Sequence, residues 1–73
     1  MEIHQQNHKF LESKGLILKP TGSYVIPYAL ETDILMLTLS EYNFLDIRNK
    51  KTNKKITLEL TKELLTDDIL NAL

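Results

Sequence analysis

Three side chains that can bind metal recur at four-residue intervals near the start of the chain: His4, His8 and Glu12. In a helix this spacing places them along one face, where two imidazoles and a carboxylate suit a zinc ion. Zinc ligands also need neighbouring groups that orient them, and no distinctive motif surrounds this set. We therefore interpret the three residues as an exposed polar stripe, with a metal-dependent enzyme as the weaker alternative.

A second group of residues with possible chemistry is a short basic run. It contains Arg48, Lys50, Lys51, Lys54 and Lys55. The segments on either side of it each carry a net charge of −3, so positive charge is concentrated in one predicted hairpin loop. Such a loop could contact nucleic-acid phosphates in a salt-dependent way, although no aromatic residue is interleaved to stack on bases. The main interpretation is a solvated loop, and the alternatives are a nucleic-acid-binding module and an acidic protein partner.

Four carboxylates near the end of the chain complete the groups with possible chemistry: Glu59, Glu63, Asp67 and Asp68. Acid–base catalysis would require a sheltered cleft that separates their pKa values, and their pattern indicates an exposed helix surface instead. The sequence has no Ser-His-Asp order, no glycine-rich phosphate loop and no cysteine motif. We therefore expect no enzymatic activity, no cofactor and no bound metal.

Length and composition limit the architecture that could position these groups. The chain has 73 residues, of which 42% are hydrophobic and 26% charged, so it predicts one small soluble domain spanning 1–73. A domain of this size buries only about 60% of its unfolded surface, and a second copy or a partner would add to its core. Self-association is therefore an early expectation.

The same composition bears on where the protein works. There is no cysteine, which fits a reducing compartment, and the polar start of the chain is unlike a signal peptide. No apolar run reaches the ~18 residues of a membrane span. We expect a cytoplasmic protein, and the abundance of lysine, isoleucine and asparagine is typical of AT-rich bacterial or phage genomes. An accessory protein of a phage or prophage is the corresponding hypothesis.

The first half of the chain predicts a helix followed by strands. A polar helix from about Ile3 to Lys14 should end at Gly15, a residue that readily adopts the left-handed conformation. A brief strand over 16–18 precedes a turn, and a strand over 24–29 follows, which Pro27 should confine to an edge or a bulge. The run 34–39 is apolar at nearly every position, which is typical of a strand covered on both faces.

The second half predicts a hairpin and a final helix. Residues 40–43 are interpreted as a turn rather than a helix begun at Ser40, and they join strands over 44–48 and 55–60. An amphipathic helix follows, capped by Thr61 or begun at Thr66. The predicted fold is α+β: an N-terminal helix, an antiparallel β-meander of three to four strands and a C-terminal amphipathic helix.

The predicted partner-binding surface consists of Tyr24, Tyr28, Ile34, Met36 and Tyr42. Tyr24 and Tyr28 should share a strand face, and exposed tyrosines are frequent interface hot spots. Two short helices on one sheet face cannot also cover the opposite face, where Ile34 and Met36 should lie. We therefore expect a non-enzymatic protein-binding or regulatory module that acts through an apolar sheet face, as a homodimer or docked on another protein.

Overall fold

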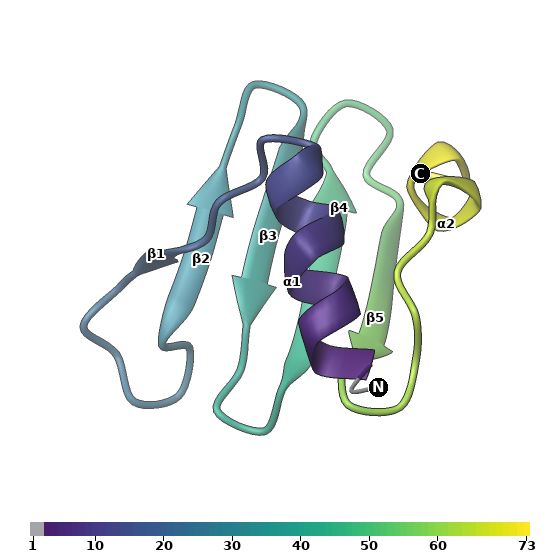
Figure 1. The fold of residues 1–73 in the computed structure, drawn as a ribbon. Coiled ribbons are helices and arrows are strands. Elements are labelled where there is room, and N and C mark those ends of the chain that lie inside the picture. Colours follow the sequence, from purple (N-terminus) through teal and green to yellow (C-terminus); the bar gives the residue numbers. More distant parts are fainter. Residues whose placement is uncertain (1–2) are drawn as a thin grey trace.

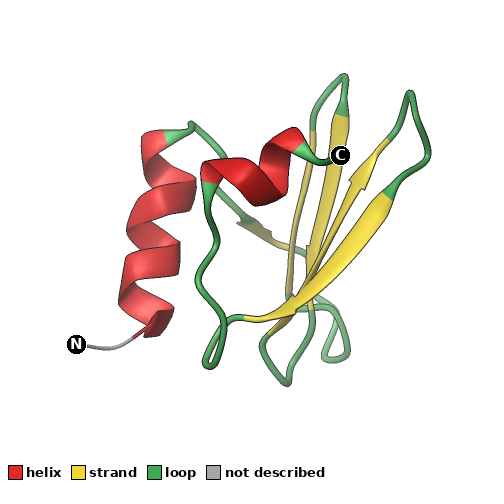
Figure 2. Cartoon of the chain, turned by 90° about the vertical axis from the view of Figure 1, so that its right-hand side faces the viewer, coloured by secondary structure: helices red, strands yellow, loops and turns green. Residues whose placement is uncertain are grey.

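Residues 3–73, which the computed structural model describes, form a sheet with two helices on one of its faces (Figures 1 and 2). The strands follow one another in the order β1-β2-β3-β4-β5, and each pairs antiparallel with the next. The predicted α+β fold is confirmed, with five strands in place of three to four. The elements are α1 (Ile3–Ser13), β1 (Lys19–Pro20), β2 (Tyr28–Glu31), β3 (Leu35–Leu39), β4 (Phe44–Asn49), β5 (Lys55–Glu59) and α2 (Asp67–Asn71).

The end of α1 is fixed by Gly15, as predicted. Gly15 has a φ of 72°, and its N–H donates to the carbonyl of Glu12 at 2.9 Å. The N–H of Leu16 reaches back to the carbonyl of Leu11, also at 2.9 Å. Both of these leucines are buried, so the turn that ends the helix also directs the chain into the core.

A buried asparagine on α1 holds the segment between β5 and α2. The Asn7 side chain is 1% exposed, and its Nδ2 donates to the carbonyls of Leu60 at 2.9 Å and Glu63 at 2.8 Å. Its Oδ1 accepts the N–H of Leu65 at 2.7 Å. One side chain thus satisfies three backbone groups of a loop that has no secondary structure of its own.

These bonds explain where the last helix begins. Thr66 is the N-cap of α2, and its Oγ1 accepts the N–H of Ile69 at 3.4 Å. Of the two predicted starts, Thr66 is confirmed and Thr61 is wrong. A helix begun at Thr61 would use the backbone groups of Glu63 and Leu65 for its own hydrogen bonds, and Asn7 already binds both.

The predicted turn over 40–43 is confirmed. Asn43 adopts a φ of 66°, the Ser40 carbonyl accepts the N–H of Asn43 at 3.1 Å, and the Ser40 N–H donates to the Phe44 carbonyl at 2.9 Å. The Ser40 hydroxyl also accepts the N–H of Phe44 at 3.1 Å. The short hairpin between β3 and β4 therefore has its own local bonds, which removes the alternative of a helix over these residues.

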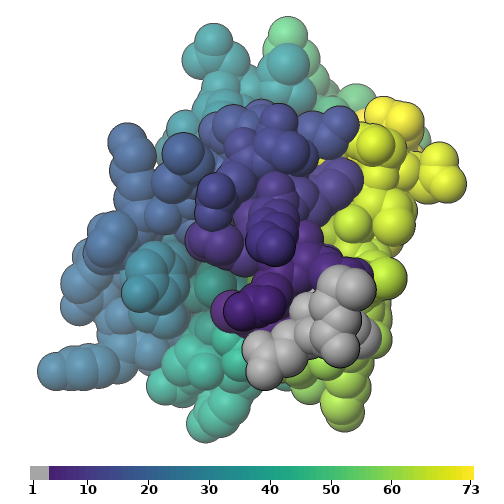
Figure 3. All heavy atoms as spheres, viewed as in Figure 1, coloured from purple at the N-terminus to yellow at the C-terminus, as the bar shows by residue number. Residues whose placement is uncertain are grey.

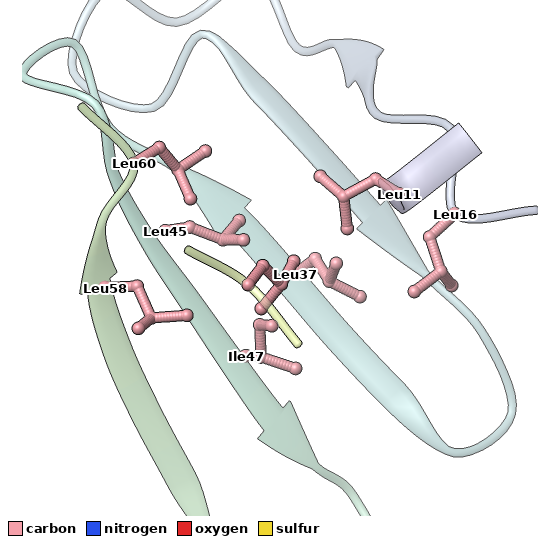
Figure 4. Packing of buried hydrophobic residues seen from close by; sticks show 8 residues of the cluster. Leu11, Leu16, Leu37, Leu45, Ile47, Leu58 and Leu60 are labelled. Atoms are coloured by element: carbon pink, nitrogen blue, oxygen red, sulfur yellow. The ribbon is translucent and has the colours of Figure 1, made fainter. Parts of the chain in front are cut away.

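The core lies between the sheet and the helices. Alternate residues of the central strands point toward α1 and α2, and Leu37, Leu45 and Ile47 are fully buried there. Figure 4 shows how these side chains gather over β3, β4 and β5. The buried hydrophobic residues are Leu11, Leu16, Leu37, Leu45, Ile47, Leu58, Leu60 and Leu65.

The opposite face of the sheet corrects one expectation. No segment of residues 3–73 covers it, and it is mainly polar rather than apolar (Figure 2). Thr38 of β3 lies beside Asp46 of β4, and the Thr57 hydroxyl donates to Asp46 at 2.6 Å. Met36 lies between Glu31 and Arg48 in the next row. The apolar run 34–39 does not make this face apolar, because the residues that the neighbouring strands contribute also determine the polarity of a sheet face.

The segment 24–27 differs from its prediction as well. It is an irregular loop, and β2 begins only at Tyr28. The Ser23 hydroxyl accepts the N–H groups of Val25 and Ile26, which bends the chain out of an extended strand. β1 forms the outer edge instead of β2, although it pairs with only two residues of β2. Within residues 3–73, neither helix is long and apolar enough to cross a membrane.

Candidate functional site

The structure separates the five residues predicted to bind a partner. Tyr24 and Tyr42 lie in two loops at one end of the sheet, whereas Ile34 lies at the opposite end, where its carbonyl accepts the N–H of Lys50 (Figure 1). Met36 lies on the polar open face, and Tyr28 lies on the helix-covered face. Tyr24 and Tyr28 therefore do not share a strand face, and the five residues do not form one surface.

Two loops that carry exposed aromatic residues are joined by a backbone hydrogen bond. The N–H of Glu41 donates to the carbonyl of Val25 at 3.1 Å, which joins loop 21–27 to turn 40–43. Tyr24 is 91% exposed and Tyr42 is 72% exposed. Local bonds from Thr21, Ser23 and Ser40 hold both loops in shape. The Thr21 hydroxyl donates to the Ile26 carbonyl. The Ser23 hydroxyl accepts the N–H groups of Val25 and Ile26, and the Ser40 hydroxyl accepts those of Tyr42 and Phe44. We call this end of the molecule, residues 21–27 and 40–43, the aromatic end.

A groove of about 490 Å³ lies on the helix-covered side, between α1 and the segment that leads through β1 to β2. Figure 3 shows this side of the molecule, with the purple atoms of α1 beside the blue atoms of the following segment. Tyr28 and Leu39 face each other across β2 and β3, and both line the groove next to the aromatic end. The lining residues are His4, His8, Leu11, Glu12, Leu16, Ile17, Leu18, Tyr28 and Leu39.

The proposed histidine stripe forms one wall of this groove. His8 Nε2 lies 2.5 Å from Glu12 Oε1, and both side chains are more than half exposed. The stripe therefore places three polar side chains along one edge of a groove whose other lining residues are apolar or tyrosine. Among residues 3–73, no group of three or more histidine and carboxylate side chains is arranged to hold a metal ion.

The basic hairpin keeps most of its charges free. All five basic side chains are exposed, but Lys50 is bound to the chain itself. Its Nζ donates to Glu31 Oε2 at 2.6 Å and to the carbonyl of Thr32 at 2.9 Å. In the described part of the chain, Arg48, Lys51, Lys54 and Lys55 have no carboxylate within ion-pair distance. Lys50 therefore positions the hairpin, and the other four remain available to a partner.

The contact with Lys50 changes the titration of Glu31. The hydrogen bond and the charge of Lys50 hold the pKa of the Glu31 carboxyl below its ordinary value, and the charge of Arg48 has a smaller effect in the same direction. Because the folded-state pKa is the lower one, the contact stabilises the fold above the unfolded-state pKa of Glu31. This contribution is lost as the pH falls through the folded-state value.

Lys50→Met is expected to raise the pKa of Glu31 toward its ordinary value, because it removes both effects of the ammonium group. The measurement is an NMR titration of the Glu31 side-chain carboxyl carbon in each variant. Lys51→Met is the matched control, since Lys51 carries the same charge in the same loop without touching Glu31. Equal pKa changes in the two variants would contradict the specific contact.

The carboxylates near the end of the chain are exposed or half-exposed, and two of the four form surface ion pairs. Lys14 Nζ lies 2.5 Å from Asp67 Oδ1, which links α2 to the end of α1. Lys62 Nζ lies 3.7 Å from Glu59 Oε2. Glu63 and Asp68 are exposed. None of the four lines the groove, so the structure brings them to no common site.

The sequence does not identify Leu39, Ile17 and Leu18 as residues that line the groove. The sequence pattern indicates only that Leu39 belongs to an apolar strand, and its position opposite Tyr28 depends on the register of β2 with β3. The predicted strand over 16–18 is wrong, because β1 begins only at Lys19, and Ile17 is 61% exposed. Its exposure follows from the path of the chain between Gly15 and β1, for which the sequence has no separate signal.

Comparison of the chain with family models, curated proteins and solved structures gave no match.

Proposed function

We propose that this chain is a non-enzymatic protein-binding module whose binding surface is the aromatic end together with the adjoining groove. The observation that supports the proposal is the exposure of Tyr24 and Tyr42 in two hydrogen-bonded loops beside the mainly apolar groove. Tyrosine loses little conformational entropy on binding and offers both an apolar ring and a hydrogen-bonding hydroxyl. Such residues, held in place before binding, are frequent hot spots of protein interfaces.

The groove indicates what the partner would insert. Six of its nine lining residues are leucine, isoleucine or tyrosine, and the three polar ones lie along the edge formed by α1. An aliphatic or aromatic side chain of the partner would be desolvated between Tyr28 and Leu39, while the His8–Glu12 pair stays at the rim. The proposed partner is therefore a protein that presents an apolar side chain on its surface.

Replacing both exposed tyrosines, Tyr24→Ser with Tyr42→Ser, is expected to lower affinity for the partner by about tenfold or more, because each truncation removes an interface aromatic. The two side chains make no contribution to the core, so the free energy of unfolding should stay within about 0.5 kcal/mol of the wild type. The measurement is capture from nuclease-treated extract of the source organism, compared between the wild type and this variant.

Leu64→Ser is the matched control for that experiment. Leu64 is an exposed apolar residue, 46% accessible, outside both the groove and the aromatic end. Its replacement should leave capture of the same protein unchanged. A protein retained equally by the double tyrosine variant and the wild type would refute the proposed surface.

A second candidate function is nucleic-acid binding by the basic hairpin, which the four free cations favour. Lys51→Glu with Lys54→Glu leaves the Lys50 contact intact and reverses two charges at the hairpin tip. If the hairpin binds phosphates, the slope of log affinity against log salt should become shallower by about 2 for a labelled duplex oligonucleotide.

The control for the hairpin variant reverses two exposed lysines elsewhere, Lys9→Glu with Lys62→Glu, and has the same net charge. Fluorescence anisotropy of the labelled oligonucleotide measures both variants across a salt series. A duplex bound equally by the two variants, or by neither and not by the wild type, would remove this second candidate.

A further inference from the structure

The two edges of the sheet differ in how well they are protected against pairing with another chain. β1 is two residues long and contains Pro20, which has no N–H to donate. β5 is a regular strand of five residues without proline, and within residues 3–73 it pairs only with β4. Short edge strands and proline are common ways in which proteins block edge pairing. Only the β1 edge has them.

The register shows which backbone groups β5 presents at its open edge. Asn49 and Lys54 are a hydrogen-bonded pair, and so are Asn43 and Leu60. Because bonded and non-bonded pairs alternate along an antiparallel ladder, Lys55, Thr57 and Glu59 direct their backbone groups away from β4. The carbonyl of Glu59 accepts Lys62 and Glu63 in the following turn. The N–H and carbonyl of Thr57, the N–H of Glu59 and both backbone groups of Lys55 have no backbone partner among the described residues.

We propose that this edge pairs with the same edge of a second copy of the chain, antiparallel and with Thr57 at the two-fold axis. This register places Lys55 of each chain opposite Glu59 of the other, so that two cross-strand pairs of opposite charge form at once. The strand is thus complementary to itself in charge. Side by side, the two copies form one continuous sheet.

The same register is favourable for the backbone and for the core. Each Thr57 exchanges N–H and carbonyl bonds with its counterpart, and each Glu59 N–H meets a Lys55 carbonyl, so four outward backbone groups of each edge gain partners. The Lys55 N–H faces the Glu59 carbonyl of the other copy, which already accepts Lys62 and Glu63. Ile56 is half-buried and lies on the helix-covered side, where it would face Leu58 of the second copy. Figure 2 views the molecule from the side on which β5 forms the edge of the sheet.

The charge pattern provides the test. Lys55→Glu creates two like-charged pairs in the proposed register, and the dimer dissociation constant should rise by about ten- to hundredfold. Glu59→Lys should weaken the dimer similarly, whereas the double variant Lys55→Glu with Glu59→Lys restores opposite charges and should restore dimerisation. Lys51→Glu is the control, since it changes the net charge equally outside β5. Sedimentation equilibrium over a concentration series measures all five proteins.

A single cysteine reports the register directly, because the chain has none of its own. Bonded antiparallel neighbours have Cα atoms about 5.5 Å apart, within the range of a disulfide, so Thr57→Cys should form a covalent dimer on mild oxidation. Lys55→Cys should not form a covalent dimer, because the two introduced cysteines would lie about 14 Å apart along the strands.

Three results would overturn the proposal: a wild type that stays monomeric throughout the concentration series, a double charge swap that fails to restore what the single variants lose, and equal crosslinking at positions 55 and 57. The test uses purified protein without any partner. Its outcome is therefore independent of the capture experiment on the aromatic end, and failure of either one leaves the other standing.

Discussion

Asn7→Ala is expected to lower the free energy of unfolding by about 2–4 kcal/mol. The substitution leaves two carbonyl oxygens and the N–H of Leu65 without their buried partner, and each such group costs about 1–3 kcal/mol when water cannot replace it fully. A 73-residue domain has a total stability of roughly 4–11 kcal/mol, so this loss is a large share of it. Urea unfolding followed by circular dichroism measures the change.

Asn7→Asp should be more destabilising than alanine at neutral pH. A carboxylate at this position would face the carbonyl oxygens of Leu60 and Glu63 and could donate to neither. Burial and these oxygens favour the protonated form, which raises the folded-state pKa above the unfolded one. The fold is then favoured below the unfolded-state pKa, and this advantage is lost as the pH rises through the folded-state pKa.

The control for Asn7 is Gln5→Ala, which removes an exposed amide from the same helix and should change stability by less than about 0.5 kcal/mol. Unfolding curves at pH 4 and pH 7 complete the comparison for the aspartate variant. An alanine variant as stable as the Gln5 control would contradict the role of Asn7 in holding the loop between β5 and α2.

Leu37→Ala is expected to cost about 3–5 kcal/mol of stability. Leu37 is fully buried at the centre of β3, where it lies between Leu30 and Ile47 in the row of side chains beneath the helices. Its truncation removes apolar contacts and leaves a cavity that the surrounding strands cannot close completely. Chemical unfolding of the variant measures the loss, and partial unfolding at room temperature is expected if the wild type lies at the low end of the stability range.

Met36→Ala is the matched comparison, because Met36 is the sequence neighbour of Leu37 and points to the opposite, uncovered face. Its side chain is only half-buried, so the expected cost is about 1 kcal/mol. Similar costs at the two positions would show that both faces of β3 are packed, as the sequence pattern had suggested, and would contradict a sheet covered on one face.

Much of this fold could be predicted because local signals agree with it. Gly15 ends α1 in the left-handed conformation, residues 40–43 form a hairpin, and alternation in β5 places Leu58 in the core and Thr57 in solvent. Each of these features is determined by neighbours in the sequence, through backbone conformation or period-two patterning.

The features that escaped prediction depend on contacts between distant residues. Asn7 lies in a polar stretch whose sequence gives no sign of burial, and its three partners are more than fifty positions away. For the same reason the start of α2 could not be chosen between Thr61 and Thr66. The open face is polar because β4 and β5 contribute Asp46, Arg48 and Thr57 to it, whatever β3 carries.

The candidate site was predicted only in part. The sequence predicts the exposed tyrosines, and Tyr24 and Tyr42 lie in two loops that a backbone hydrogen bond between Val25 and Glu41 joins, a contact that no pattern in the sequence indicates. The groove was not foreseen, because it requires the position of α1 relative to β2, which is set by the turn at Gly15 and by the burial of Leu11 and Leu16.

Site-specific photocrosslinking tests the proposed binding surface most directly. A benzophenone side chain is placed at Tyr42 in one variant and at Leu64 in another, and each is irradiated in nuclease-treated extract of the source organism. We expect one predominant crosslinked protein, other than a second copy of the chain, from position 42 and little or none of it from position 64. Equal crosslinking from the two positions, or none from position 42, would contradict a protein-binding surface at the aromatic end.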